Sequence, residues 1–251
     1  MWSSAARESG ILWSVAAGNQ ARLHFAGTAA DANGDGWVEF SGTTQRLPLE
    51  PSRTATVGLR WDAWPTTNED LDLYVMSQPH PPTGDNDPDL KAVSTRSQKD
   101  TTDGLSPTEQ VTFTNTTSIT TTHWVYVKNN NAKFVTPVEL FVNGPSDQLQ
   151  TFTKAGSVAE PATSPHVIAV CVTAPNSGAV ESCSSRGPTV DGRIKPGITA
   201  FDKVSTRPSA SSPARRPPRR TWPMPRRCSS PPTPVSTPRS RSMCEISLVR
   251  V

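Results

Sequence analysis

The sequence Asp-Ala-Asn-Gly-Asp-Gly, which begins at Asp31, has the spacing of a cation-binding loop. Asp31, Asn33 and Asp35 place oxygen-bearing side chains at its first, third and fifth positions, and a glycine at the sixth allows a sharp turn, as in the first half of a calcium loop. Gly42 stands at the twelfth position, where such a loop carries a bidentate Glu. We therefore expect weak calcium binding at most, and favour the alternative of an Asx-rich turn between strands.

A second pair of carboxylates, Asp70 and Asp72, alternates with Leu71 and Leu73. In a strand, alternate residues point to the same face, so the two acids share one side. We interpret them as residues that solvate this face rather than as a catalytic acid pair.

Two short stretches about 165 residues apart are the most informative motifs. Residues 14–19 read Ser-Val-Ala-Ala-Gly-Asn, which by itself indicates only a short buried strand and a turn. Residues 184–196 read Ser-Ser-Arg-Gly-Pro-Thr-Val-Asp-Gly-Arg-Ile-Lys-Pro. In this order, the two stretches resemble neighbouring pieces of the catalytic domain of subtilisin-like serine proteases. Residues 165–170, Pro-His-Val-Ile-Ala-Val, suit a further central parallel strand.

The resemblance implies a role for two residues. Asn19 would donate its side-chain amide to the oxyanion, and Ser209, followed by small residues and Pro213, would stand in the place of the nucleophile. The family's Gly-Thr before that serine is Arg207-Pro208 here, so the nucleophile motif is degenerate.

Serine chemistry also needs a base. A serine hydroxyl becomes nucleophilic when an imidazole removes its proton and a carboxylate fixes that imidazole's tautomer. None of the four histidines has the family's Gly-Thr-His context, and the family's Asp-Ser/Thr-Gly motif is not recognisable either. We expect His24, His80, His123 and His166 to serve packing or the surface, and the chain as it stands to be inactive.

Between the two peptidase-like pieces, apolar residues alternate with polar ones in short runs separated by Pro, Gly, Asn and Asp. This period of two predicts antiparallel strands of a β-sandwich. The runs are Val57, Leu59 and Trp61; Leu71, Leu73 and Val75; Val111 and Phe113; Trp124 and Tyr126; Val138, Leu140 and Val142. Residues 59–62 and 70–75 resemble the pre-peptidase C-terminal type of sandwich found with secreted bacterial proteases, here inserted within the catalytic domain.

Residues 207–251 differ from the rest of the chain. They hold ten Arg, ten Pro and one acidic residue, and so carry about +9 of a chain whose net charge is +3. With few aliphatic residues, this segment is expected to be disordered. A frameshift in a GC-rich gene would explain it; a basic arm for nucleic acid is the alternative, which we rank last.

Cysteines and hydropathy contribute little to the interpretation. Cys171 and Cys183 are expected to be small buried thiols, and the spacing of the four cysteines supports neither a metal site nor a disulfide framework. No apolar run approaches the roughly 20 residues that span a membrane, and residues 1–17 do not make a signal peptide.

These observations predict an α/β fold: a partial subtilisin-like parallel-sheet core, interrupted by an antiparallel β-sandwich and followed by a disordered tail. The expected boundaries are 1–22 and 155–206 for the core pieces, 23–154 for the insert and 207–251 for the tail. The expected function is that of a fragment of a subtilisin-like endopeptidase; the alternative is a non-catalytic sandwich that binds carbohydrate, protein or calcium. By resemblance the substrate is a polypeptide, the location extracellular, and no cofactor is required, with calcium a candidate ligand.

Overall fold

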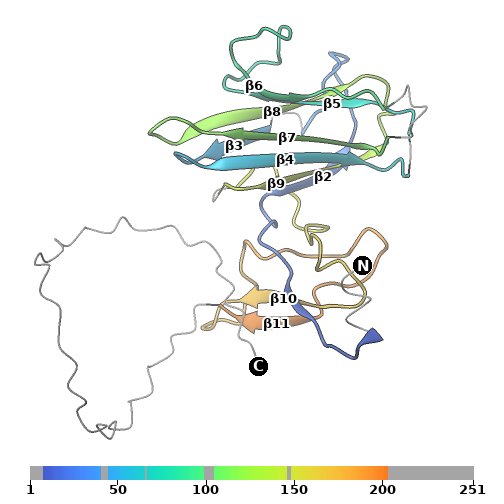
Figure 1. Cartoon of the computed structure of the whole chain (residues 1–251), viewed down its shortest axis with the longest axis vertical. Helices are drawn as coiled ribbons and strands as arrows, with labels where there is room; N and C mark the ends of the chain where they lie inside the picture. Colours follow the sequence, from blue (N-terminus) through green and yellow to red (C-terminus); the bar gives the residue numbers. More distant parts are fainter. Residues whose placement is uncertain (1–7, 41–44, 66, 99–104, 146–147, 203–251) are drawn as a thin grey trace, which may run out of the picture.

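The computed structural model describes residues 8–40, 45–65, 67–98, 105–145 and 148–202. Every secondary-structure element defined in these ranges is a β-strand. Three sheets result: a three-stranded parallel sheet and two four-stranded antiparallel sheets. In Figure 1 the antiparallel sheets stack as two layers, and the strands of the parallel sheet lie outside them.

The antiparallel sheets form the predicted β-sandwich. One sheet has the order β2-β9-β4-β7 and the other β3-β8-β5-β6. The strands are β2 (His24–Thr28), β3 (Gln45–Leu49), β4 (Thr54–Trp61), β5 (Leu71–Met76), β6 (Leu90–Ser94), β7 (Thr108–Thr114), β8 (Thr121–Asn129) and β9 (Pro137–Asn143).

Alternation in the sequence located most of the sandwich core. In β4 and β9, buried residues alternate with less buried ones, because one face of each strand looks into the space between the sheets. β8 departs from the expected pattern: Val125 and Val127 enter the core, whereas the predicted Trp124 is only partly buried. Tyr126 is buried, but on the opposite side of the sheet, against Trp37.

The parallel sheet joins pieces from both ends of the described chain. β1 (Ser14–Ala16), β10 (Ile168–Thr173) and β11 (Ile198–Phe201) lie in the order β1-β10-β11. Ser14 pairs with Ile168, and Val170 with Ile198. The two stretches predicted to form parallel strands, residues 14–17 and 165–170, therefore are neighbours.

The predicted α/β class is wrong for the described residues, which form an almost entirely β structure with antiparallel sheets and one small parallel sheet. A parallel sheet normally has helices as crossovers, and these cover its faces. Here the connection from β1 to β10 is the sandwich itself. The connection from β10 to β11 contains Pro175, Pro188 and Pro196 among several glycines, a composition that opposes a helix.

Exposed apolar residues lie in this sheet and in the segments next to it. Ile194 is 90% exposed and Leu12 78%, and all four residues of β11 are exposed. The tail, including Ser209, lies outside the described residues, and the domain boundaries stay predictions. No helix long and apolar enough to cross a membrane occurs in the described ranges.

Candidate functional site

Asn19 lies just beyond the carboxyl end of β1, the edge of a parallel sheet where open α/β proteins place their ligands. The turn that carries it depends on Gly18, which has a φ of 106°. A Cβ at this position would meet the Gln20 side chain at 2.2 Å and Ser185 Oγ at 3.0 Å. Only glycine tolerates both the backbone conformation and the close approach.

Hydrogen bonds tie this turn to the second motif, 165 residues away. Ser185 N–H donates to the Gly18 carbonyl at 2.9 Å, and Gln20 N–H donates to Ser185 Oγ at 3.0 Å. Ala21 N–H reaches the Cys183 carbonyl at 3.2 Å. We call these contacts the Gly18–Ser185 clasp. They bring together the two stretches whose resemblance motivated the peptidase hypothesis.

The rest of the second motif is anchored to β10. Val172 N–H donates to Ser184 Oγ at 3.1 Å, and Lys195 Nζ donates to the Val167 carbonyl at 2.6 Å. Between these anchors, Asp191 and Arg193 form an ion pair of 2.7 Å at an exposed turn. The hydrogen bond from Arg193 lowers the pKa of Asp191 to about 2. The Asp-Gly-Arg part of the motif thus has a local structural role.

The four histidines lie on four separate segments of the structure. His24 is fully buried, with Nδ1 2.7 Å from the Thr153 carbonyl oxygen. His123 is buried against the Phe113 ring, and burial lowers its pKa. His166 lies at the amino edge of the parallel sheet, opposite Asn19, and His80 lies on a sandwich loop between β5 and β6.

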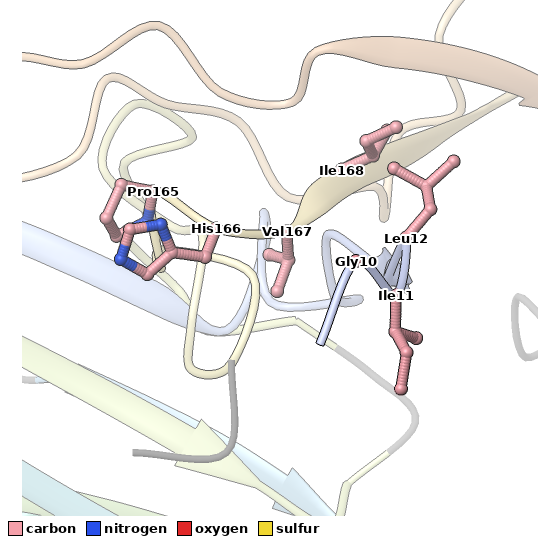
Figure 2. Close-up of a pocket in the computed structure, with 7 residues that line it drawn as sticks. All are labelled: Gly10, Ile11, Leu12, Pro165, His166, Val167 and Ile168. Carbon is pink, nitrogen blue, oxygen red and sulfur yellow. The ribbon is translucent and has the colours of Figure 1, made fainter. Parts of the chain in front are cut away.

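A cavity of about 540 Å³ lies at that amino edge (Figure 2). Its lining comes from Gly10–Leu12, just before β1, and from Pro165–Ile168, which lead into β10. Because parallel strands share one direction, this cavity and Asn19 lie at opposite ends of the strands. The cavity is therefore not part of the Asn19 site.

The calcium-like loop is folded as an Asx turn. Asp31 accepts hydrogen bonds from the N–H groups of Asp35 at 3.0 Å and Gly36 at 2.8 Å, and Asn33 Oδ1 accepts from Asp35 N–H at 2.9 Å. Its side-chain oxygens thus organise the backbone, as the favoured alternative expects. Calcium binding at Asp31, Asn33 and Asp35 stays a prediction.

Beside this loop is a second cavity, of about 220 Å³, in the sandwich. Asp35 and Glu39 contribute carboxylates to its wall, and Trp37 and Tyr126 contribute rings 5.8 Å apart. The sequence did not predict this cavity because Trp37 and Tyr126 lie on segments 89 residues apart that only the sheet brings together.

The interpretation of Asp70 and Asp72 as solvated residues is wrong. They are only 4% and 7% exposed. Burial, and then the charge of Asp70, raise the pKa of Asp72 above its usual value, while a hydrogen bond from Asn130 opposes the shift. Glu109, 4% exposed on β7, also has a raised pKa because of burial, with Asp72 as a further cause.

Gln98 connects this buried acid cluster. Its backbone N–H donates to Asp70 at 3.1 Å, and its side-chain amide donates to Glu109 at 2.6 Å. Gln98 follows β6 and reaches Asp70, just before β5, over 28 residues of sequence, while the Trp37 ring packs against Tyr74 on β5. Alternation within β5 could not reveal these contacts with distant segments.

The cysteine expectation holds for one residue of two. Cys171 is a free buried thiol, and burial raises its pKa. Cys183 is disulfide-bonded, so the expectation of a thiol there is wrong.

Comparisons with known proteins give limited information. No protein-family model matches the sequence, and no curated protein matches it significantly. Among solved structures, the CspB protease of Clostridium perfringens is similar to this chain, at 14% sequence identity and a TM-score of 0.48. The similarity covers 76% of this chain but only 41% of the protease, so the chain spans less than half of that protein's length. At this distance we draw no conclusion on function from it.

We predict that Gly18→Ala weakens the clasp. The alanine would have to adopt a left-handed backbone conformation, and its Cβ would lie 3.0 Å from Ser185 Oγ. Gly178→Ala is the matched control, with a φ of 67° but open space around its Cβ position. Both variants should lose about 1 kcal/mol of stability from backbone strain. Only Gly18→Ala should also speed amide exchange at Ser185, which hydrogen-exchange mass spectrometry would detect; equal exchange in both variants would contradict this.

A second prediction concerns the buried acid cluster. Burial raises the pKa of Asp72 in the folded state, so the ionised carboxylate opposes folding. The contribution of this residue to stability is greatest at low pH, where Asp72 is protonated, and is lost as the pH rises through the folded-state pKa. Asp72→Asn should therefore stabilise the chain more at about pH 8 than at about pH 4. Urea unfolding of both proteins at each pH measures this difference. Exposed Asp85→Asn, the control, should show no such dependence.

Proposed function

We propose that this chain carries part of the catalytic domain of a subtilisin-like serine endopeptidase, into which a β-sandwich is inserted. The observation that carries the proposal is the Gly18–Ser185 clasp at the carboxyl edge of three parallel strands. Two motifs that resemble the same family are joined there by hydrogen bonds, although the whole sandwich separates them in sequence. A chance likeness of either motif would not require this contact.

In the intact enzyme, Asn19 would donate a hydrogen bond to the oxyanion that forms when a peptide carbonyl is attacked. A donor of this kind lowers the barrier by about 3 kcal/mol in comparable sites. A serine in the Ser209 context would attack, and a histidine and an aspartate, which this chain does not offer in recognisable motifs, would activate it. The proposal places the intact protein outside the cell, with a polypeptide as substrate and no required cofactor.

The chain itself is then expected to be inactive. None of the four histidines stands in the family's motif, so we expect no base that activates a serine near Asn19. We predict that the purified chain neither hydrolyses casein nor reacts with a fluorophosphonate probe. Labelling of Ser209 would contradict this, since it requires an activating base.

The gene provides the decisive test of the proposal. DNA upstream of residue 1 should encode Asp-Ser/Thr-Gly and His-Gly-Thr-His motifs in frame, and one of the other two frames after Thr206 should restore Gly-Thr-Ser or His-Val-Ala-Gly. The extended protein should cleave casein, and Asn19→Ala should lower its kcat about 100-fold or more. If these motifs are missing from every frame, the peptidase proposal fails and the basic-arm hypothesis for residues 207–251 rises.

A second candidate is a binding module that uses the sandwich alone. The cavity beside the Asp31 loop favours it, because Trp37 and Tyr126 offer aromatic surface next to the carboxylates of Asp35 and Glu39. This pairing of rings and acceptors is typical of sites for neutral, hydroxyl-rich ligands such as carbohydrate. Soluble polysaccharides should then change Trp fluorescence, and Trp37→Ala should abolish that change while Trp64→Ala, exposed elsewhere, should not.

A further inference from the structure

The loop between β5 and β6 gathers three side chains with metal-binding atoms. His80, Asp87 and Asp89 each offer one such atom, and these atoms lie within 4.8 Å of one another. Within the described ranges, no other group of three histidine, cysteine or acidic side chains meets this distance. Sequence spacing alone does not single out the group, although three alternate acids, Asp85, Asp87 and Asp89, follow His80 closely.

The contacts of His80 call for a positive charge beside the ring. Nδ1 lies 3.0 Å from the Pro81 carbonyl oxygen, and Nε2 lies 3.2 Å from Asp89 Oδ2. Both oxygens are acceptors, whereas a neutral imidazole has a single N–H to donate. When Nδ1–H donates to Pro81, the lone pair of Nε2 faces a carboxylate. A proton or a metal ion between them removes this conflict.

The two carboxylates are held in place by other groups. The Asp87 side chain is only 2% exposed. Its Oδ2 accepts hydrogen bonds from the N–H and the hydroxyl of Thr83, both at 2.9 Å, and its Oδ1 accepts from Asp89 N–H at 2.9 Å. Asp89 Oδ1 accepts from Ser77 Oγ at 2.8 Å, which turns Oδ2 toward His80. Such outer partners orient the ligands in metal sites.

We propose that His80, Asp87 and Asp89 form a binding site for a divalent transition metal, with zinc as the best-fitting ion. One imidazole nitrogen and two carboxylates are zinc ligands, and three protein ligands leave a coordination position open. Calcium fits less well, because it takes six to eight oxygen ligands. Each ring nitrogen of His80 faces one carboxylate of the group: Nε2 lies 3.2 Å from Asp89 Oδ2, and Nδ1 lies 3.9 Å from Asp87 Oδ2.

A metal here would also act on the neighbouring cavity. Pro79 and Pro81, which flank His80, line the cavity of Trp37 and Tyr126. Cross-linking the β5–β6 loop through an ion therefore fixes one wall of that cavity. The site goes beyond either function proposed above, since neither uses His80.

The test is a calorimetric titration of the full chain with zinc, with the free cysteine thiols blocked by alkylation and the disulfide of Cys183 left intact, so that thiolates do not compete. His80→Ala and Asp89→Asn should each weaken zinc binding about tenfold or more, as loss of a supporting or direct ligand does. Asp85→Asn removes the same charge from the same loop outside the group, and should leave the affinity unchanged. Circular dichroism should confirm that all variants keep the wild-type strand content.

Nuclear magnetic resonance gives a second readout on the unmodified sequence. Zinc should shift the imidazole signals of His80 and leave those of His166 in place. Absence of zinc binding, equal affinity in His80→Ala and wild type, an equal loss in Asp85→Asn, or displacement of zinc by equimolar calcium would each overturn the proposal.

Discussion

The architecture depends on the sandwich beginning and ending at the same place. Thr153 N–H donates to the His24 carbonyl at 2.8 Å, and Leu149 N–H donates to the Arg22 carbonyl at 3.0 Å. The chain therefore enters and leaves the sandwich at one point, as domains that tolerate insertion do. Since the ends of this long connection already meet, β1 and β10 can pair in parallel at little further entropic cost. The clasp and the position of Asn19 follow from that pairing.

The parallel sheet contrasts with the sandwich in how its apolar surface is covered. The sandwich buries its strands between two layers, and Leu47, Leu73 and Leu140 are fully inaccessible there. The parallel sheet leaves Leu12, Ile194 and Phe201 largely exposed.

The sandwich contains two groups of carboxylates with different surroundings. Asp72 and Glu109 lie inside, where burial raises their pKa values and the amide of Gln98 supplies partial compensation. Asp87, which is also buried, and Asp89 lie on the loop between β5 and β6, where Thr83 and Ser77 donate to them and His80 Nε2 lies 3.2 Å from Asp89. The first arrangement stabilises the protonated acid, whereas the second concentrates negative charge around an imidazole. Electrostatically, only the second is suited to receive a cation from solution.

The sequence by itself determined the local features. Alternation located the strands of the sandwich, as in β4 and β9, because each needs only one buried face. The stretches at residues 14–19 and 165–170 indicated parallel neighbours, and Gly18 marked the turn. Tertiary structure alone decided what covers each strand. It buried Asp70 and Asp72, the first of them in contact with Gln98, and shifted the core side of β8 to Val125 and Val127. Within the described residues it left the parallel sheet without the expected helices. It also assembled His80 with Asp87 and Asp89, because the path of the loop between β5 and β6, rather than the spacing of these residues, decides which of its side chains meet.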